Sequence, residues 1–334
     1  MSLSQLPLPL LCLLIPASLY AAPPEAERHA RRCQGYAARG SAPRSGALLW
    51  GTWGTWEDSH PRAGERRSVL VSVDVTAPLI ADPEVRGLHL EKGRLVASPQ
   101  PVSSLVGTVL RGSSSEGKPV EVAICGVEPA PADPDMAWYR IEAWNPVAQA
   151  WVNPCMATAR IPDPRAMAVN GVWDSSGARR QVPGRLTLAC ENSAIAWCIR
   201  WGYKPWTRLD GQPLAELHQA CTRLARADYC GNGTSHALQD APVELYDTLG
   251  VRPLAAEARE RGALERSSFE AAWAPDGAVC LARTRDGRGL EEIQKECPGR
   301  FASGTPLEVG DGDSCALRRT GVSREAVVLK NRGY

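Results

Sequence analysis

His236 is the residue whose type and neighbours come closest to catalytic chemistry in this sequence. It follows Ser235, and Asp228 and Tyr229 lie a few residues before it. A histidine beside a hydroxyl and a carboxylate can act as a general base that activates a nucleophile. The same ring can instead hydrogen-bond within its own loop and brace it, and no second histidine lies close in the sequence. We therefore treat His236 as a weak catalytic candidate for a hydrolase.

Other patterns of catalytic or metal chemistry are incomplete. The run Gly310–Cys315 resembles the Gly-Asp-Ser of trypsin-like serine peptidases, but Cys315 stands where the glycine after the serine is required. The sequence has no Gly-x-Ser-x-Gly elbow. It also has no Cys-x-x-Cys pair, which argues against a zinc ribbon and a thioredoxin-like redox site. The five histidines are scattered without ligand spacing, so we expect no metal and no cofactor.

An aromatic turn and a nearby carboxylate are the binding candidates. Tyr203 and Trp206 flank Lys204-Pro205 in a segment between two expected helices. Loops held by a rigid scaffold often carry binding residues, whereas clustered aromatic rings more often pack against one another. We name Tyr203, Trp206 and Asp228 as candidates for contacting a partner. The partner that we expect is a cell-envelope glycan or protein.

Two helices that this turn would join are expected to position the candidates. The first starts at Ser193, whose hydroxyl can cap it, and the second starts near Pro213, a favoured first helical position. Apolar residues recur in each at spacings of three and four, which gives each helix one buried face. That face contains Cys198 in the first helix and Cys221 in the second. We therefore predict an antiparallel helical hairpin.

The hairpin geometry predicts two nested disulfides. Facing residues of an antiparallel hairpin have a nearly constant sum of residue numbers, and the pairs Cys198–Cys221 and Cys190–Cys230 have nearly equal sums. Both pairs would then bring their Cα atoms within the roughly 7 Å that a disulfide requires. Local Cys190–Cys198 and Cys221–Cys230 pairs are the alternative. For the remaining cysteines we predict the pairs Cys125–Cys155, Cys297–Cys315 and Cys33–Cys280.

The segment containing the hairpin resembles a known domain family. The run Ala227-Asp228-Tyr229-Cys230-Gly231, with Leu-Ala-Cys, Ala-Ile-Ala-Trp-Cys and Trp-Gly-Tyr-Lys-Pro-Trp before it and Gly-Thr-Ser-His after it, is similar to the ADYC domain. Asn232-Gly233 follows here, where many members have Asp-Gly. The resemblance covers about residues 180–285, and the β-rich part before them more loosely. It implies an extracytoplasmic bacterial protein, of a family found largely in myxobacteria, and it implies no activity.

Composition and the N-terminal segment both indicate export. The 334-residue chain has a formal net charge of +1, which gives no electrostatic reason to bind nucleic acid. Residues 1–22 combine an apolar run with Ala21-Ala22, as in a secretory signal peptide. This run is too short to span a bilayer, and no later segment is apolar enough. Of the eleven cysteines only Cys12 lies in this apolar run, which leaves ten in the rest of the chain. An even number of cysteines behind an export signal indicates disulfides in a periplasmic or secreted protein.

The expected architecture is α+β, with two folded parts behind a flexible arm. Residues 23–65, rich in Ala, Arg, Gly, Pro and Ser, are predicted to form the arm. Residues 66–180 show alternating apolar residues and turn signals, which predict a β-rich sandwich or barrel-like domain. Residues 181–334 are predicted to form an ADYC-like, disulfide-stapled domain with the helical hairpin and a small antiparallel sheet. We expect a non-enzymatic binding or structural module of the cell envelope or the secreted fraction, and the alternative is an extracytoplasmic hydrolase with its site around His236.

Overall fold

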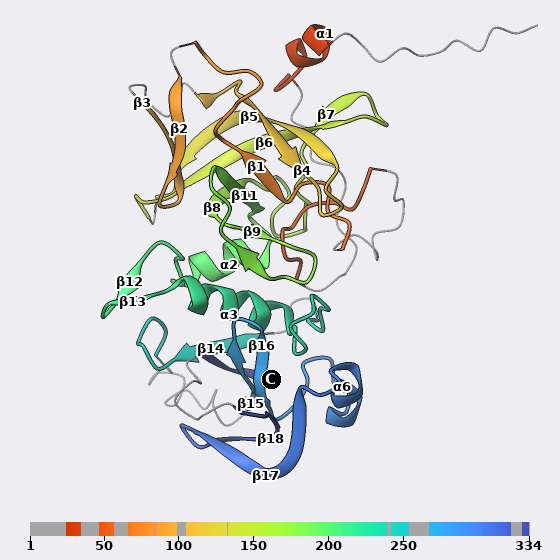
Figure 1. The fold of residues 1–334 in the computed structure, drawn as a ribbon, viewed down its shortest axis with the longest axis vertical. Helices are drawn as coiled ribbons and strands as arrows, with labels where there is room; N and C mark the ends of the chain where they lie inside the picture. Colours follow the sequence, from red (N-terminus) through yellow and green to blue (C-terminus); the bar gives the residue numbers. More distant parts are fainter. Residues whose placement is uncertain are drawn as a thin grey trace, which may run out of the picture.

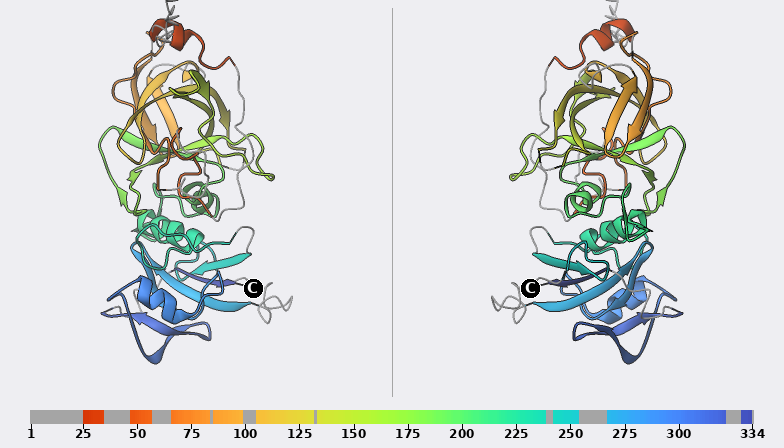
Figure 2. Two further views of the ribbon diagram at one scale, coloured as in Figure 1. Left: turned by 90° about the vertical axis from the view of Figure 1, so that its right-hand side faces the viewer. Right: turned by 90° about the vertical axis from the view of Figure 1, so that its left-hand side faces the viewer.

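The protein is built from three layers that follow one another along its longest axis. The structure is a computed structural model, in which residues 25–34, 47–56, 66–83, 85–98, 105–131, 133–238, 242–253, 267–321 and 329–333 are described. A β-barrel, a pair of helices and an open β-sheet make up the layers, with the helices in the middle (Figure 1; Figure 2). The predicted signal peptide, residues 1–22, lies outside the described residues.

A closed barrel of six strands forms the first layer. The strands of this layer are β1 (Ser72–Asp74), β2 (Arg86–Glu91), β3 (Arg94–Ser98), β4 (Val109–Ser113), β5 (Pro119–Pro129), β6 (Ala137–Asn145), β7 (Ala150–Val152), β8 (Ala166–Asn170), β9 (Val172–Trp173), β10 (Arg179–Arg180) and β11 (Arg185–Cys190). The barrel order is β5-β4-β1-β11-β8-β6, and β5 also pairs with β6, which closes the ring. β7 extends the sheet beyond β6, and the β2–β3 hairpin adds Leu88 and Leu95 to the barrel core.

Alternation along β6 explains how the barrel is filled. Tyr139, Ile141 and Ala143 belong to the barrel core, while Trp138 belongs to a second core between the barrel and the helices. Successive side chains of a strand point to opposite faces, so one strand contributes to both cores. The barrel-like domain that alternation predicts is therefore present, and the fold is α+β as expected.

Two of the predicted boundaries need correction. β11 lies beyond residue 180, yet it pairs with β1 and β8 and completes the barrel. In the predicted arm, the described residues 47–56 are packed against the fold. Trp50 is 1% exposed, and Thr52 forms a β-bridge with Cys155. Burial of a tryptophan removes a large apolar surface from water, which holds this part of the arm in place.

The second layer is the predicted helical hairpin. Its elements are α2 (Ala194–Arg200), β12 (Arg208–Leu209), β13 (Gln212–Pro213) and α3 (Ala215–Arg226). Ser193 caps α2 as predicted, since its hydroxyl accepts the backbone N–H of Ala196 at 3.0 Å. α2 packs on the barrel through Ile195, and α3 packs on the sheet through Leu224. Within the described residues, no helix is both long and apolar enough to cross a membrane.

A six-stranded antiparallel sheet forms the third layer, with the order β14-β19-β15-β16-β18-β17. Its elements are β14 (Val243–Asp247), β15 (Ser268–Ala274), β16 (Gly277–Leu281), β17 (Phe301–Gly310), β18 (Asp313–Arg319) and β19 (Leu329–Gly333), and α6 (Leu290–Glu296) lies beside them. The turn at Pro275-Asp276-Gly277 joins β15 to β16. Gly277 has a φ of +116°, a conformation that glycine adopts without steric strain.

The ten cysteines that were expected to form disulfides are all paired, although mostly in other combinations than predicted. The bridges are Cys33–Cys125, Cys155–Cys190, Cys198–Cys221, Cys230–Cys297 and Cys280–Cys315. Cys198–Cys221 is the predicted bridge of the hairpin, with Cα atoms 5.8 Å apart. The predicted pairs Cys190–Cys230, Cys125–Cys155, Cys297–Cys315 and Cys33–Cys280 are wrong.

Cys190 and Cys230 do not pair because the helical hairpin is too short to include both of them. Cys190 ends the barrel strand β11 and lies in the barrel core, where it meets Cys155. On the other side, Ala227 ends α3 in the left-handed conformation, with a φ of 49°, and turns the chain away from α2. Cys230 therefore reaches Cys297, directly after α6.

Candidate functional site

Asp228, the second residue after α3, is an internal counter-ion. Its side chain is 0% exposed, and Oδ2 lies 2.6 Å from Nη1 of Arg223, whose side chain is 3% exposed. The carboxylate also accepts the backbone N–H groups of Asn232 at 3.2 Å and Gly233 at 3.0 Å. A buried carboxylate needs such partners, because burying an unpaired charge is costly. The predicted contact of Asp228 with a partner is therefore corrected: Asp228 holds the loop after α3 in place.

Tyr229 connects the same loop to the sheet. Its hydroxyl donates to Glu270 at 3.1 Å and accepts the backbone N–H of Arg285 at 2.7 Å. Its ring stacks on Trp273, with centroids 5.5 Å apart. Burial, together with the charge of Glu270, raises the pKa of Tyr229 well above its ordinary value. Tyr229 is therefore a neutral structural side chain.

Both ring nitrogens of His236 lie within hydrogen-bond distance of oxygens of the scaffold. Nδ1 lies 3.0 Å from the carbonyl oxygen of Ala227, and Nε2 lies 3.0 Å from Oε2 of Glu296. The side chain of His236 is 1% exposed. Ser235 donates to the carbonyl oxygen of Arg226 at 2.9 Å, so its hydroxyl is engaged by the end of α3. The His236 side chain thus ties α6 to the end of α3.

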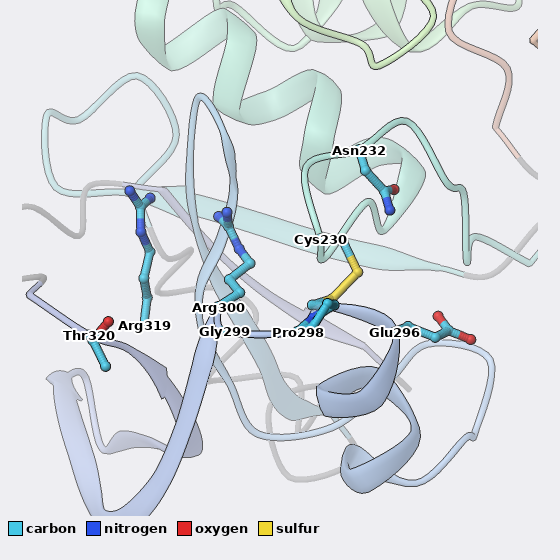
Figure 3. Close-up of a pocket in the computed structure, with 9 residues that line it drawn as sticks. Cys230, Asn232, Glu296, Pro298, Gly299, Arg300, Arg319 and Thr320 are labelled. Atoms are coloured by element: carbon cyan, nitrogen blue, oxygen red, sulfur yellow. A yellow bond between two sulfur atoms is a disulfide. The ribbon is translucent and has the colours of Figure 1, made fainter.

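A pocket opens beside this loop, next to the end of α6 and strands β17 and β18 (Figure 3). Its volume is about 390 Å³, within the range of roughly 300–1,000 Å³ that small-molecule sites occupy. Its lining residues are Cys230, Asn232, Glu296, Cys297, Pro298, Gly299, Arg300, Arg319 and Thr320. The Cys230–Cys297 bridge forms part of the wall, so the motif after α3 positions one side of the pocket.

Two arginines give the pocket a positive side. Arg300 directly precedes β17, Arg319 ends β18, and their side chains extend in the same direction (Figure 3). Asp276, in the β15–β16 turn, lies 2.6 Å from Nη1 of Arg319 and 3.6 Å from Nη2 of Arg300. One carboxylate therefore faces two guanidinium groups. Burial lowers the pKa of Arg300 from its ordinary value even though Asp276 acts in the opposite direction.

Glu296 gives the pocket an acidic group that is already paired. Its Oε1 accepts from Nη1 of Arg288, and its Oε2 faces Nε2 of His236. The side-chain oxygen of Asn232 accepts the backbone N–H of Thr234 at 2.9 Å, which leaves the amide NH₂ group of Asn232 for another acceptor. The pocket thus combines cationic and neutral hydrogen-bond donors with one bonded carboxylate.

The aromatic turn between α2 and α3 is not part of this pocket. Tyr203 is 0% exposed, and its hydroxyl donates to Asp247 at 2.9 Å. Trp206 is partly buried and packs on the core between the barrel and α2, beside Gly93 and Met136. Because Tyr203 is buried, its predicted contact with a partner is corrected to a packing role. Trp206 is partly exposed, so its binding role stays a prediction.

A second group of side chains lies at the far end of the barrel. Helix α1 (Glu25–Ala30) places Nε2 of His29 2.8 Å from Oε2 of Glu121 on β5. Glu25, His29 and Glu121 are close enough to share a metal ion. Arg28 already pairs with Glu121 at 2.5 Å, however, so these contacts are sufficient as an anchor of α1 on the barrel.

Fold and pocket together define a disulfide-stapled α+β protein in which a closed barrel and an open sheet enclose a helical hairpin. The ADYC domain family matches residues 102–287, more than half of the chain, and the chain belongs to that family. The match runs from β4 to β16 and begins well before the residues that carry the resemblance. Searches of curated proteins and of solved structures found no match.

Sequence reasoning did not single out Arg300, Arg319 or Glu296. Arg300 and Arg319 meet only because β17 and β18 pair with Phe301 opposite Arg319. A weak signal existed, since Pro298-Gly299 marks the end of a helix directly before Arg300. Single arginines are common on strand surfaces, so that signal could not indicate a pocket.

Proposed function

We propose that this protein is a non-enzymatic binding module that a bacterium exports to its envelope or secretes. In this proposal the ligand is held in the pocket beside the Cys230–Cys297 bridge. The observation that carries the proposal is how this pocket is built. Its wall is formed by the Cys230–Cys297 disulfide, the end of α6 and the paired strands β17 and β18, and polar side chains line it. Binding residues are often presented in this way, on loops that a rigid scaffold positions.

Five disulfides support the extracytoplasmic part of the proposal. Disulfides of this number persist in oxidising compartments and are rare where thiols are kept reduced. The apolar segment in residues 1–22 supports the same location, because it resembles a secretory signal. Cell fractionation of the native host that found the protein in the cytoplasm with free thiols would contradict this location.

The hydrolase alternative at His236 has less support. A general base must present a ring nitrogen to a nucleophile or to a water that it activates. Among the described residues, the ring nitrogens of His236 face the carbonyl oxygen of Ala227 and the carboxylate of Glu296. Its neighbour Ser235 bonds elsewhere. These contacts favour a structural histidine.

The binding proposal can be tested by blocking the pocket. The oxidised full-length protein is screened against a panel of cell-envelope glycans and peptides by thermal shift and calorimetry. Thr320 is exposed and lines the pocket, so Thr320→Trp should obstruct it while leaving the fold intact. Thr305→Trp, at an exposed position of β17 outside the pocket lining, is the matched control.

We expect a ligand that binds the wild type and Thr305→Trp but not Thr320→Trp. A panel without any binding ligand would contradict the proposed function. Binding that survives in Thr320→Trp would place the ligand elsewhere and would contradict the proposed site.

A further inference from the structure

We propose that this pocket recognises an oxyanion, the phosphate or carboxylate group of an acidic sugar, between the guanidinium groups of Arg300 and Arg319. The inference rests on the proposed binding function and names the chemical class of its ligand. It is carried by the charge balance, the unused hydrogen-bonding capacity and the size of the pocket.

The charge balance on the arginine side is positive. Arg300 and Arg319 both face Asp276, so one negative charge is shared by two positive charges. The side chain of Asp276 is 53% exposed, which weakens its compensation of the more buried Arg300 through solvent screening. Asp228, another carboxylate that acts on Arg300, is already bonded to Arg223. A bound anion would supply the negative charge that this side of the pocket lacks.

Arg300 also has unused hydrogen-bonding capacity. Its Nε donates to the carbonyl oxygen of Ala278 at 3.1 Å, but its buried Nη2 makes no hydrogen bond among the described residues. The 3.6 Å separation of this nitrogen from Asp276 is an ion pair and too long for a good hydrogen bond. A buried donor without an acceptor is unfavourable. The nitrogen is buried against Gly277, so a rotation of the Arg300 side chain would present it to an oxyanion in the pocket, which would then be its acceptor.

The geometry suits a planar or tetrahedral oxyanion. Guanidinium groups bind carboxylates and phosphates through paired N–H donors, and such charge-assisted hydrogen bonds are stronger than neutral ones. Arg300 and Arg319 extend side by side in Figure 3, from positions that β17 and β18 fix next to each other. Arg319 is the last residue of β18, and Arg300 lies in the turn directly before β17, opposite the same end of β18.

The rest of the pocket indicates a hydroxylated ligand. Besides their bonds to Arg288 and His236, the carboxylate oxygens of Glu296 have further lone pairs. Asn232 offers its amide, and both residues lie at the side of the pocket away from Arg319 (Figure 3). Sugar hydroxyls can donate to the first group and accept from the second. The volume of about 390 Å³ accommodates a sugar unit. An acidic sugar satisfies both sides at once, whereas a simple inorganic anion satisfies only one.

The test compares three related ligands by calorimetry on the oxidised full-length protein. Glucose 6-phosphate and glucuronate carry the two oxyanions, and glucose is the neutral control. We expect at least one of the acidic sugars to bind roughly tenfold or more tightly than glucose, because charge-assisted hydrogen bonds contribute that much selectivity. Binding should weaken at high salt, since part of the attraction is between exposed charges. Which of the two binds more tightly distinguishes phosphate from carboxylate.

Arginine variants locate the effect. Arg319→Gln and Arg300→Gln should each weaken binding of the preferred sugar roughly tenfold. Arg318→Gln, on the same strand but at the next and exposed position, removes the same charge and should leave the affinity unchanged. Arg319 is 33% exposed, so its variant should fold even if the Arg300 variant does not.

Equal affinity for glucose and both acidic sugars, or unchanged affinity in Arg319→Gln, would overturn the inference. If a neutral glycan binds and Thr320→Trp abolishes that binding, the proposed function stands and the oxyanion assignment falls. If a peptide binds at the pocket and no glycan does, the oxyanion assignment falls and the proposed function stands. If neither glycans nor peptides bind, both fall.

Discussion

Replacing Asp228 with alanine tests whether the loop that positions the pocket depends on a buried ion pair. The variant would leave the guanidinium group of Arg223, with its side chain 3% exposed, without the carboxylate 2.6 Å away. Removing one partner of a buried pair costs roughly 3–5 kcal/mol, because the other charge stays buried and uncompensated. The N–H of Gly233 would lose its acceptor as well. We therefore expect the free energy of unfolding to fall by about 4–5 kcal/mol.

The loss of stability can be measured by urea unfolding, followed through tryptophan fluorescence, and by the melting temperature. For a cooperative unit of about 150–250 residues, each kcal/mol lowers the melting temperature by roughly 2–4 °C, so we expect a fall of about 10–15 °C. Asp228→Asn keeps the shape and should cost less. Glu216→Ala removes an equal charge from the exposed first turn of α3 and should cost under about 1 kcal/mol.

A loss in Asp228→Ala no larger than that in Glu216→Ala would refute this reasoning. Arg223 also donates to the carbonyl oxygens of Ser176 and Pro275. Such a result would mean that these neutral acceptors stabilise the guanidinium group without the carboxylate.

Three further predictions concern the helical layer and its bridges. Cys198→Ala with Cys221→Ala removes a bridge that closes a sequence separation of 23 residues and should lower the free energy of unfolding by about 3 kcal/mol; unchanged stability in urea would contradict this. Burial lowers the pKa of His218 to about 3, so the native state resists a proton that the unfolded state accepts near pH 6.5. Stability should therefore fall by about 1.4 kcal/mol for each pH unit below about 6.5. Lowering the pH from 6.5 to 4.5 should consequently destabilise the wild type more than His218→Gln. An equal loss of stability in both proteins would count against a neutral buried ring. Non-reducing peptide mapping should join Cys230 to Cys297, and recovery of Cys230 with any other partner would disprove that bridge.

Much of the fold was predictable because its signals are local. Alternating apolar residues in residues 66–180 predicted the barrel-like domain, and in β6 they put Tyr139 and Ile141 on one face and Trp138 on the other. The cap at Ser193 and the facing cysteines Cys198 and Cys221 identified the helical hairpin. Each of these signals depends on residues within one element or on two adjacent elements.

The parts that could not be predicted depend on contacts between distant segments. Cys33 meets Cys125 only because α1 packs on the barrel, at a sequence separation of 92 residues. Asp228 is charged and follows a helix, which is typical of a surface residue, and only its pairing with Arg223 explains its burial. Spacing along the chain contains no information about such contacts.

The order of strands in space has a consequence for any attempt to produce the family region by itself. β1 lies between β4 and β11, and β19 lies between β14 and β15, yet both fall outside residues 102–287. A polypeptide cut at those limits would lack an inner strand in each sheet and expose unpaired edges, which are sites of aggregation. It would also leave Cys125, Cys230 and Cys280 without their partners. The region that is recognisable by sequence is thus smaller than the unit that can fold, and expression should start before Cys33 and continue through β19.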